Sequence, residues 1–376
     1  MANYFIPSEH LSFADYVKQC RIGIEKGRRD LHHYPNPSYI IDANTPYELI
    51  PDSKEHHYQH GVLLIHGLLD CPFSLKEIGD RLQKNGVFCR SLLLPGHGTH
   101  PSDLLHVNYQ DWIKTVEYGI ACLKEKVDRI FLLGYSTGAT LSILEALQNH
   151  HLIAGIILIA PAIKIKTPID VLVGWRRLIK WMSQNKEWLY RADENDYTKY
   201  HSITFHAVMQ VYKLTEMINR SHEKNSLACP LFIVMSKEDE TVSAQAALDF
   251  FSLTDHPHNQ FLLYVKHKLH LPDERIIQRI THYQDLNIEH FSHVSLPFSP
   301  DNTHYGKQGD YPYATHVTHD NEFVYGAYNH IETQAHEFLY HFGLSKKRCR
   351  ELTYNPDFDF MIKKIVGFIE SIQQKS

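Results

Sequence analysis

Gly134-Tyr135-Ser136-Thr137-Gly138 is the stretch that decides the fold of this chain. The apolar run Phe131-Leu132-Leu133 precedes it, and residues 139–144 continue it with the composition of a helix. A serine flanked by glycines, after a strand and before a helix, is typical of a nucleophile elbow. The turn is so tight that larger side chains at the glycine positions would clash with neighbouring backbone. The sequence therefore predicts that Ser136 is a catalytic nucleophile.

Strands that are apolar on both faces alternate with helices around this stretch. The predicted strands are 61–65, 87–94, 129–133, 154–160, 230–235 and 260–265. The predicted helices include 74–83, 109–126 and 358–373. A strand that is apolar throughout must be covered on both sides, which is typical of a parallel sheet between two helical layers. We therefore expect an α/β protein with a mostly parallel central sheet and helices on both faces.

Two segments depart from this alternation. Residues 1–58 form a polar lead-in with several prolines and a helix predicted near 11–29. The alternation also stops at 164–228, which predicts an all-helical insertion that acts as a lid or, alternatively, as an extra outer layer. Its large aromatic residues, expected on helical segments, are Trp175, Trp181, Trp188 and Tyr190. The predicted α/β core is then 59–163 together with 229–376.

Composition restricts the partners of the protein. The 376 residues are 43% hydrophobic and carry a net charge of −5, with acids and bases interspersed. The sequence contains no basic block, which argues against nucleic acid as a partner. No apolar run approaches the roughly 18 residues of a membrane span, and residues 1–20 lack the pattern of a signal peptide. We therefore expect a cytoplasmic protein without an integral membrane segment.

The cysteines and histidines predict neither disulfides nor a metal site. Six cysteines are scattered without a C-x-x-C pair, and most fall within predicted strands or helices, so we expect them to be reduced and buried. His336 and His341 come close to a zinc motif, but a spacing of five residues places them on different faces of a helix. We expect no metal and no cofactor.

A serine nucleophile needs a base to accept its proton and an acid to orient that base. In the fold built around this elbow, the acid follows the serine and the histidine follows the acid. The turn after the strand at 231–235 offers Asp239, a short carboxylate anchored before Val242, as the acid. Its neighbours Glu238 and Glu240 are expected to be solvated.

Two apolar runs compete to supply the histidine. Residues 260–265 lead to His267 and His270, whereas residues 286–291 lead to His293. The spacing along the chain favours the first pair.

The oxyanion that forms during acyl transfer needs backbone N–H donors. Thr137, at the N-terminus of the elbow helix, is one expected donor. Leu68 is the other, because it follows the strand at 61–65 and the adjacent Gly67 allows a close backbone approach. His66 is expected to be a structural hydrogen-bonding residue.

The motifs taken together resemble the α/β-hydrolase superfamily. They are H-G-L-L at 66–69, L-P-G-H-G at 94–98, G-Y-S-T-G at 134–138, A-P-A at 160–162 and E-D-E-T-V at 238–242. The chain is most similar to the serine esterase branch that includes monoacylglycerol lipases, lysophospholipases and bacterial carboxylesterases. The resemblance covers roughly residues 60–250, and it implies a structural role in a loop for His97.

The C-terminal part resembles bacterial relatives of this branch. F-S-H-V-S-L-P-F-S-P at 291–300 is similar to a segment whose histidine completes the triad, and L-T-Y-N-P-D-F at 352–358 is similar to the start of the last helix. The resemblance therefore implies His293 as the base. Asp239 and His293 are, however, farther apart than in the compact esterases, and a long segment follows the histidine.

The resemblance implies hydrolysis of carboxylic esters through an acyl-enzyme on Ser136. The expected substrate is a small-molecule ester of the acylglycerol or lysophospholipid type, and the aromatic residues of the predicted lid suggest an apolar acyl group. Thioester hydrolysis, amide hydrolysis and acyl transfer use the same triad and remain alternatives. An inactive hydrolase scaffold that only binds a partner is a third hypothesis.

Overall fold

The computed structural model describes residues 4–52, 56–149, 151–166, 187–222, 226–312, 323–328 and 348–372. These residues form two compact units. Unit 1 contains the described residues up to 158 and those from 187 to 230, and unit 2 contains 159–166 and the described residues from 231 onward.

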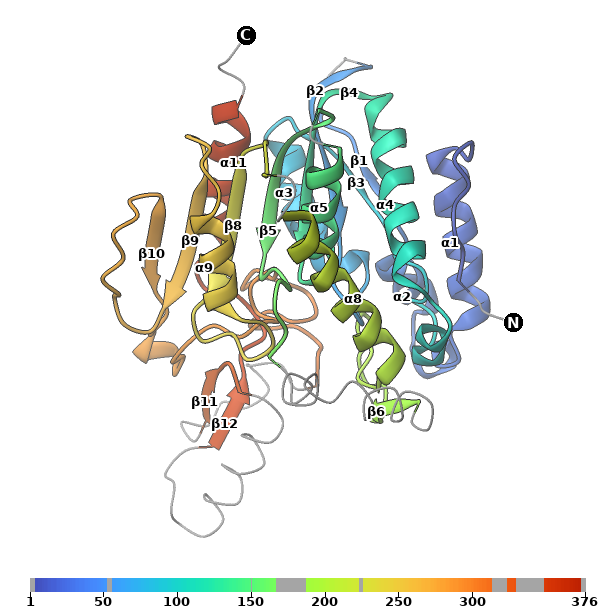
Figure 1. Ribbon diagram of the computed structural model, residues 1–376. Helices are drawn as coiled ribbons and strands as arrows, with labels where there is room; N and C mark the ends of the chain where they lie inside the picture. The colour runs from blue at the N-terminus through green and yellow to red at the C-terminus, as the bar shows by residue number, and fades with distance from the viewer. Residues whose placement is uncertain are drawn as a thin grey trace, which may run out of the picture. The chain divides into compact units, whose positions relative to one another are not determined.

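Unit 1 is built around a row of strands (Figure 1). Their hydrogen-bonded order is β1, β3, β2, β4, β5, with bounds Glu48–Leu49, Phe88–Ser91, Tyr58–Ile65, Val127–Tyr135 and Ile153–Ile159. β2 is parallel to both β3 and β4, whereas the short β1 is antiparallel to β3. Nearly every residue of β2, β4 and β5 is buried, as expected for strands covered on both faces.

Helices connect the parallel strands of unit 1. The α-helices are α1 (Phe13–Gly27), α2 (Pro37–Asn44), α3 (Lys76–Lys84), α4 (Tyr109–Lys124), α5 (Thr137–Gln148) and α8 (Phe205–His222). Short 3-10 helices are η1 (Leu31–His33), η2 (Pro72–Leu75) and η3 (Pro101–Leu105). The helix predicted near 11–29 is α1, and it packs into unit 1 through its fully buried Tyr16. The hydroxyl of Tyr16 donates to the Leu93 carbonyl at 2.9 Å and accepts from the Leu93 N–H at 3.0 Å.

The insertion predicted to be all-helical contains strands as well. β6 (Trp188–Tyr190) pairs antiparallel with β7 (Ile203–Thr204), so Trp188 and Tyr190 lie on a strand and the prediction is wrong there. Aromatic and β-branched side chains favour extended backbone, and that preference prevails over the helical interpretation. α8 follows as a helix, whereas Trp175 and Trp181 lie outside the described residues.

Unit 2 has its own parallel strands. β8 (Leu231–Ser236), β9 (Gln260–Val265) and β10 (Ile276–Ile280) are hydrogen-bonded in that order. The helices are α9 (Ala244–Ser252), α11 (Phe358–Ser371) and the 3-10 helix η4 (Gln284–Leu286). A separate parallel pair consists of β11 (Phe323–Gly326) and β12 (Arg348–Glu351). The predicted α/β class and the mostly parallel arrangement of strands are therefore confirmed.

One predicted strand candidate is wrong. The apolar run 286–291 begins in η4 and continues through a left-handed Asn287 (φ 52°), so it forms no strand of the sheet. The third strand of unit 2 is instead β10, an edge strand of the sheet in which every residue is at least partly exposed. Edge strands need no continuous apolar pattern, and Gln278 and Arg279 interrupt the apolar residues of β10, so the sequence does not predict this strand.

All six cysteines are buried and unpaired, as predicted. Within the described ranges, no helix combines the length and the apolar character that crossing a bilayer requires.

Candidate active site

Ser136 lies between the end of β4 and the start of α5, in a strained backbone conformation with φ 53° and ψ −113°. Residues other than glycine rarely adopt a positive φ, and the conformation persists only where the surroundings enforce it. A Cβ atom on Gly134 would lie 2.3 Å from the Gly138 carbonyl oxygen, and a Cβ atom on Gly138 would lie 2.0 Å from that of Ile65. Both positions therefore require glycine, and the predicted nucleophile elbow is present.

The loop at residues 67–70, called the Gly67 loop below, lies beside this elbow. Ile65 at the end of β2 is in register with Gly134 at the end of β4, so the two following loops leave the same edge of the sheet. A Cβ atom on Gly67 would stand 3.1 Å from the Cβ atom of Ser136. The predicted donors Leu68 and Thr137 therefore lie on the two backbone segments that meet at Ser136.

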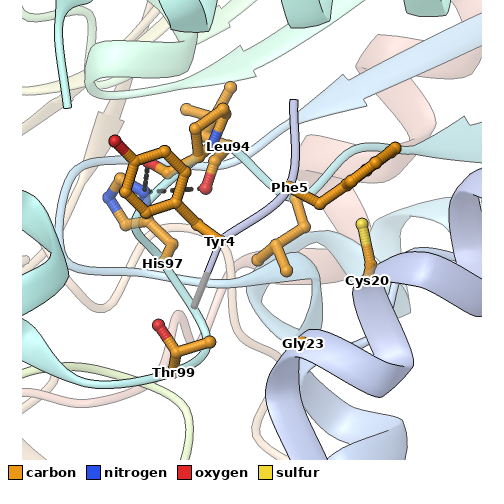
Figure 2. Close-up of a pocket in the computed structure, with 9 residues that line it drawn as sticks. Tyr4, Phe5, Cys20, Gly23, Leu94, His97 and Thr99 are labelled. Atoms are coloured by element: carbon orange, nitrogen blue, oxygen red, sulfur yellow. Dashed lines mark hydrogen bonds between the residues drawn. The ribbon is translucent and has the colours of Figure 1, made fainter. Parts of the chain in front are cut away.

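His66 and His97 support this region through hydrogen bonds. His66 Nδ1 is bonded to the Gly67 carbonyl at 2.8 Å, and its Nε2 accepts from the Leu94 N–H at 3.0 Å. Burial lowers the pKa of His66 to about 4, so the ring is neutral. His97 Nδ1 is bonded to the carbonyl of Leu94 at 3.1 Å, as the dashed lines of Figure 2 indicate. Both rings hold the polypeptide loops in place, as their sequence context predicts.

A small cavity lies next to His97. Figure 2 shows Tyr4 and Phe5 from the N-terminal segment facing Cys20 of α1 and the segment that carries Leu94, His97 and Thr99. The cavity has room for little more than one water molecule. It is too small to hold an ester substrate.

Unit 2 contains a buried acid–base pair. The Asp239 Oδ2 and His293 Nδ1 atoms are 2.7 Å apart, and the two side chains are 0% and 7% exposed. The other oxygen of Asp239 accepts from the N–H groups of Thr241 and Val242, each at 2.8 Å. These donors stabilise the carboxylate form and fix its orientation. With its Nδ1 held by a carboxylate, the neutral ring carries its proton there and Nε2 is the basic nitrogen.

Serine side chains hold the segment that carries His293. Ser236, at the end of β8, donates its hydroxyl to the Phe291 carbonyl at 2.7 Å. Ser292 donates to the Leu352 carbonyl at 2.5 Å. His293 is therefore positioned by bonds to distant parts of unit 2 rather than by a strand that ends at its own position.

Glu238 and Glu240 are only partly exposed and bind backbone N–H groups, whereas the prediction made them freely solvated turn residues. Glu240 accepts the backbone N–H of His293 through both carboxylate oxygens, at 3.1 and 3.3 Å. Burial raises the pKa of Glu240, and the adjacent Asp239 carboxylate raises it further, while His293 opposes the shift. Glu238 accepts the Lys266 N–H at 3.3 Å, and burial raises its pKa as well. Glu240 is thus a contact of the acid–base pair that sequence reasoning missed.

His267 and His270, the alternative candidates for the base, are both exposed residues beyond the end of β9. The carboxylate of Asp239 is bonded to His293 instead. Of the predicted residues, the structure therefore brings Asp239 and His293 together in unit 2, and Leu68, Ser136 and Thr137 together in unit 1. The described residues include no group of three or more His, Cys, Asp or Glu side chains suited to a metal ion, and His336 and His341 lie outside them.

These groups are of the chemical types that acyl transfer uses. Unit 1 presents a serine hydroxyl at a helix N-terminus, where backbone N–H groups and the helix dipole favour a developing negative charge. Unit 2 presents a histidine whose tautomer is fixed by a buried carboxylate. A nucleophile, a base, an acid and an anion-stabilising backbone are the components that this reaction requires.

Comparison with known proteins agrees with this chemistry. The chain is 30% identical over 182 residues to a thermostable monoacylglycerol lipase of Bacillus sp. (strain H-257), a match that covers 48% of this chain and 71% of the relative. It is 34% identical over 83 residues to a carboxylesterase of Bacillus subtilis (strain 168), covering 22% of this chain and 34% of that protein. A solved structure from work on LipS and LipT, two metagenome-derived lipolytic enzymes, has a TM-score of 0.50 at 20% identity and covers 58% of this chain and 86% of that one.

The family described as serine aminopeptidase, S33, matches residues 56–271, which is more than half of the chain. The matched region includes the elbow of Ser136 and the turn that carries Asp239, and it ends before His293. The protein is therefore a member of the S33 family of α/β-hydrolases.

Proposed function

We propose that this protein hydrolyses carboxylic esters of the monoacylglycerol type through an acyl-enzyme on Ser136. The single observation that carries the proposal is the strained Ser136 elbow in a chain whose relatives are a monoacylglycerol lipase and a carboxylesterase. The buried Asp239–His293 pair supports it, because a serine hydroxyl is a weak nucleophile without such a base.

In the proposed reaction, His293 Nε2 takes the proton of Ser136 Oγ as this oxygen attacks the ester carbonyl carbon. The N–H groups of Leu68 and Thr137 bind the resulting oxyanion. His293 then returns the proton to the leaving alcohol, which departs as the acyl-enzyme forms. A water molecule, which gives a proton to the same histidine, then attacks the acyl carbon. As this second tetrahedral intermediate collapses, the bond to Ser136 Oγ breaks, His293 returns the proton to this oxygen, and the free acid departs. Asp239 stays ionised and stabilises the imidazolium throughout.

The substrate is proposed to combine an apolar acyl chain with a small polar alcohol such as glycerol. The relative that acts on monoacylglycerol supports this choice. We also propose that residues 164–228 act as a cap on the site. Support comes from the Tyr200 N–H, which donates to the Leu69 carbonyl at 2.7 Å and so ties this segment to the loop beside Ser136.

A reducing compartment such as the cytoplasm is the proposed location. Six buried cysteines without a single disulfide support it, because secreted proteins of an oxidising environment commonly pair theirs.

The test is a series of 4-nitrophenyl esters of rising chain length, together with release of glycerol from monoacylglycerols. We expect turnover by the wild-type protein on both substrate classes and none above background by Ser136→Ala. Circular dichroism must show that the variant is folded. A folded wild-type protein that hydrolyses none of these esters would contradict the proposal, and activity towards thioesters alone would replace it with thioester hydrolysis.

A further inference from the structure

A short segment of the proposed cap reaches the backbone beside the nucleophile. Residues 196–200, called the Tyr200 segment below, contact the Gly67 loop directly, because the N–H of Tyr200 donates to the Leu69 carbonyl at 2.7 Å. Leu69 has a positive φ of 66°, which an ordinary side chain adopts only under constraint. The bond from Tyr200 is one such constraint.

The Tyr200 segment is itself firmly anchored within unit 1. The Tyr197 carbonyl accepts from the Arg28 guanidinium and from the Asn44 amide, each at 2.7 Å. The Tyr200 hydroxyl accepts the Thr99 N–H at 2.7 Å. Asp196 is buried and caps the turn by accepting the N–H and the hydroxyl of Thr198 at 2.8 and 2.9 Å. The segment is therefore rigid enough to fix the position of a loop that it touches.

Lys199 belongs to the Tyr200 segment and precedes the residue that bonds to Leu69. Its ammonium nitrogen is 5.7 Å from the ring centroid of Tyr135, the residue that immediately precedes Ser136. Cations at this distance from an aromatic face are attracted to it. The ring of Tyr135 also borders the Gly67 loop, because a Cβ atom on Gly67 would stand 3.3 Å from Tyr135 Cδ1.

Asp70, the last residue of the Gly67 loop, has an unusual environment. Its side chain is only 2% exposed, and one oxygen accepts the Cys71 N–H at 2.9 Å. The other oxygen is buried without a hydrogen-bond partner. Burial raises the pKa of Asp70, and the charge of Lys199 is the largest influence that opposes this rise. The Ser74 hydroxyl and the Cys71 N–H also favour the ionised form of Asp70. The charge of Lys199 therefore assists a carboxylate that is costly to bury.

We propose that Lys199 is a positioning residue for the oxyanion site. Its ammonium group holds the ring of Tyr135, which borders the Gly67 loop, and thereby fixes this loop beside Ser136. The inference rests on the proposed function, because it assigns the Leu68 N–H to the oxyanion. Lys199 itself takes no part in bond making. Its loss should lower the rate of the chemical step and leave the binding of a small neutral ester unchanged.

The first test compares Lys199→Met, which removes the charge, with Lys199→Arg, which keeps it. Lys213→Met is the matched control, because Lys213 also lies over an aromatic ring, that of Tyr109 at 5.9 Å, and is exposed on α8. With 4-nitrophenyl butyrate, we expect Lys199→Met to lower kcat by about tenfold or more, with KM within about twofold, since a displaced oxyanion donor acts on the transition state. Lys199→Arg should recover most of the rate, and Lys213→Met should match the wild type.

A trifluoromethyl ketone inhibitor provides a second readout. It forms a hemiketal with Ser136 whose oxygen occupies the oxyanion site, so its Ki should rise in Lys199→Met by the same factor as kcat/KM falls. Asp70→Asn added to Lys199→Met should restore part of the rate, because it removes the charge that lost its partner. A purely structural role would lower the melting temperature of Lys199→Met and would give neither of these effects.

Three outcomes would overturn the inference. They are wild-type kinetics for Lys199→Met, a loss that appears only as a higher KM for anionic esters, and a Ki that does not follow kcat/KM. The second outcome would make Lys199 a binding residue for the substrate head group. Failure of the proposed function is distinguishable, because it would appear as a folded wild-type protein that hydrolyses no ester, or as ester hydrolysis that survives in Ser136→Ala.

Discussion

Glu240 places a second carboxylate next to Asp239, and it accepts the backbone N–H of His293 while Asp239 accepts from the ring. The histidine is thereby held at two points by two successive residues of one turn. At the scale of single residues, the proposed reaction depends on this double hold, because a base displaced by a fraction of an ångström loses its alignment with the serine.

Replacement of Glu240 tests this hold. Glu240→Gln keeps an oxygen that can accept the His293 N–H, so we expect kcat within about threefold of the wild type, whereas Glu240→Ala should lose about tenfold because an N–H bond to a charged group is lost. Glu238→Ala is the control, since Glu238 is bonded to Lys266 rather than to the histidine. Steady-state kinetics on one nitrophenyl ester suffice. Equal rates for Glu240→Ala and the wild type would show that Asp239 alone positions the ring.

The identity of the base has its own test. We expect His293→Ala to lower kcat by roughly a thousandfold or more, since removal of a triad histidine eliminates general base catalysis. His267→Ala should retain the wild-type rate, because this exposed residue lies outside the contacts of Asp239. The measurement is kcat on the same ester, with circular dichroism to verify folding. A reversed result, with His267→Ala inactive and His293→Ala active, would assign the base to His267.

At the scale of elements, the helix α5 that follows Ser136 also contains a buried carboxyl group. Glu145 lies on this helix with only 1% of its surface exposed, and burial raises its pKa from 4.5 to about 7, against the effect of its bond to Asn149. The folded state therefore binds the Glu145 proton more tightly than the unfolded state does. Between these two pKa values stability falls as the pH rises, and above about 7 the full penalty of a buried carboxylate is present.

Glu145→Gln should remove this penalty. We expect the variant to exceed the wild type in unfolding free energy by about 2–3 kcal/mol at about pH 8, and to match it at about pH 4.5. Urea unfolding at the two pH values measures the difference, and Glu125→Gln, an exposed residue at the end of α4, serves as the control. A difference that is the same at both pH values would show that the carboxyl does not titrate as described.

Two glycines in helices should respond oppositely to the same substitution. Gly138→Ala places a methyl group 2.0 Å from the Ile65 carbonyl oxygen, so we expect severe destabilisation or failure to fold. Gly367→Ala, in α11, meets no atom within 4 Å and should raise the unfolding free energy by about 0.5–1 kcal/mol. Thermal unfolding measures both. A stable Gly138→Ala protein with wild-type activity would contradict the close packing of the elbow against β2.

The sequence predicts the elements whose pattern comes from residues adjacent along the chain. The Ser136 elbow needs two glycines because Gly134 packs against Gly138 and Gly138 packs against Ile65. The buried strands β2, β4 and β8 contain the uninterrupted apolar runs 62–65, 130–133 and 231–235. The edge strand β10 and the pair β6 and β7 were missed, because none of them contains an apolar run as long as those of the buried strands.

The contacts of the site were less predictable than the elements. Chain spacing favours His267 or His270, and only the resemblance of residues 291–300 to related esterases points to His293. Nothing local reveals that the bonds from Ser236 to Phe291 and from Ser292 to Leu352 hold the His293 segment. Glu240 and Lys199 were missed for the same reason, since their contacts come from other parts of the fold.

At the scale of the whole molecule, the accessibility of the cysteines to thiol reagents measures whether both units are folded. Cys20 and Cys89 belong to unit 1 and Cys349 to unit 2, and all six cysteines are buried and unpaired. Burial also raises the pKa of the Cys20 and Cys229 thiols to about 12. Because the thiolate is the reactive form, the native protein should be inert to thiol reagents.

We expect Ellman's reagent to detect almost no thiol in the native protein and six in guanidinium chloride. Activity should be the same with and without a reducing agent. Fewer than six thiols after denaturation would reveal a disulfide, and rapid reaction of the native protein would reveal a cysteine that is accessible.

The central claim is that Ser136 becomes acylated during ester hydrolysis. The most direct measurement is mass spectrometry of the protein after reaction with a fluorophosphonate, followed by mapping of the labelled peptide. We predict a single adduct on Ser136 and its complete absence in folded Ser136→Ala. A folded wild-type protein that stays unlabelled while it hydrolyses esters, or a label on another residue, would contradict the account.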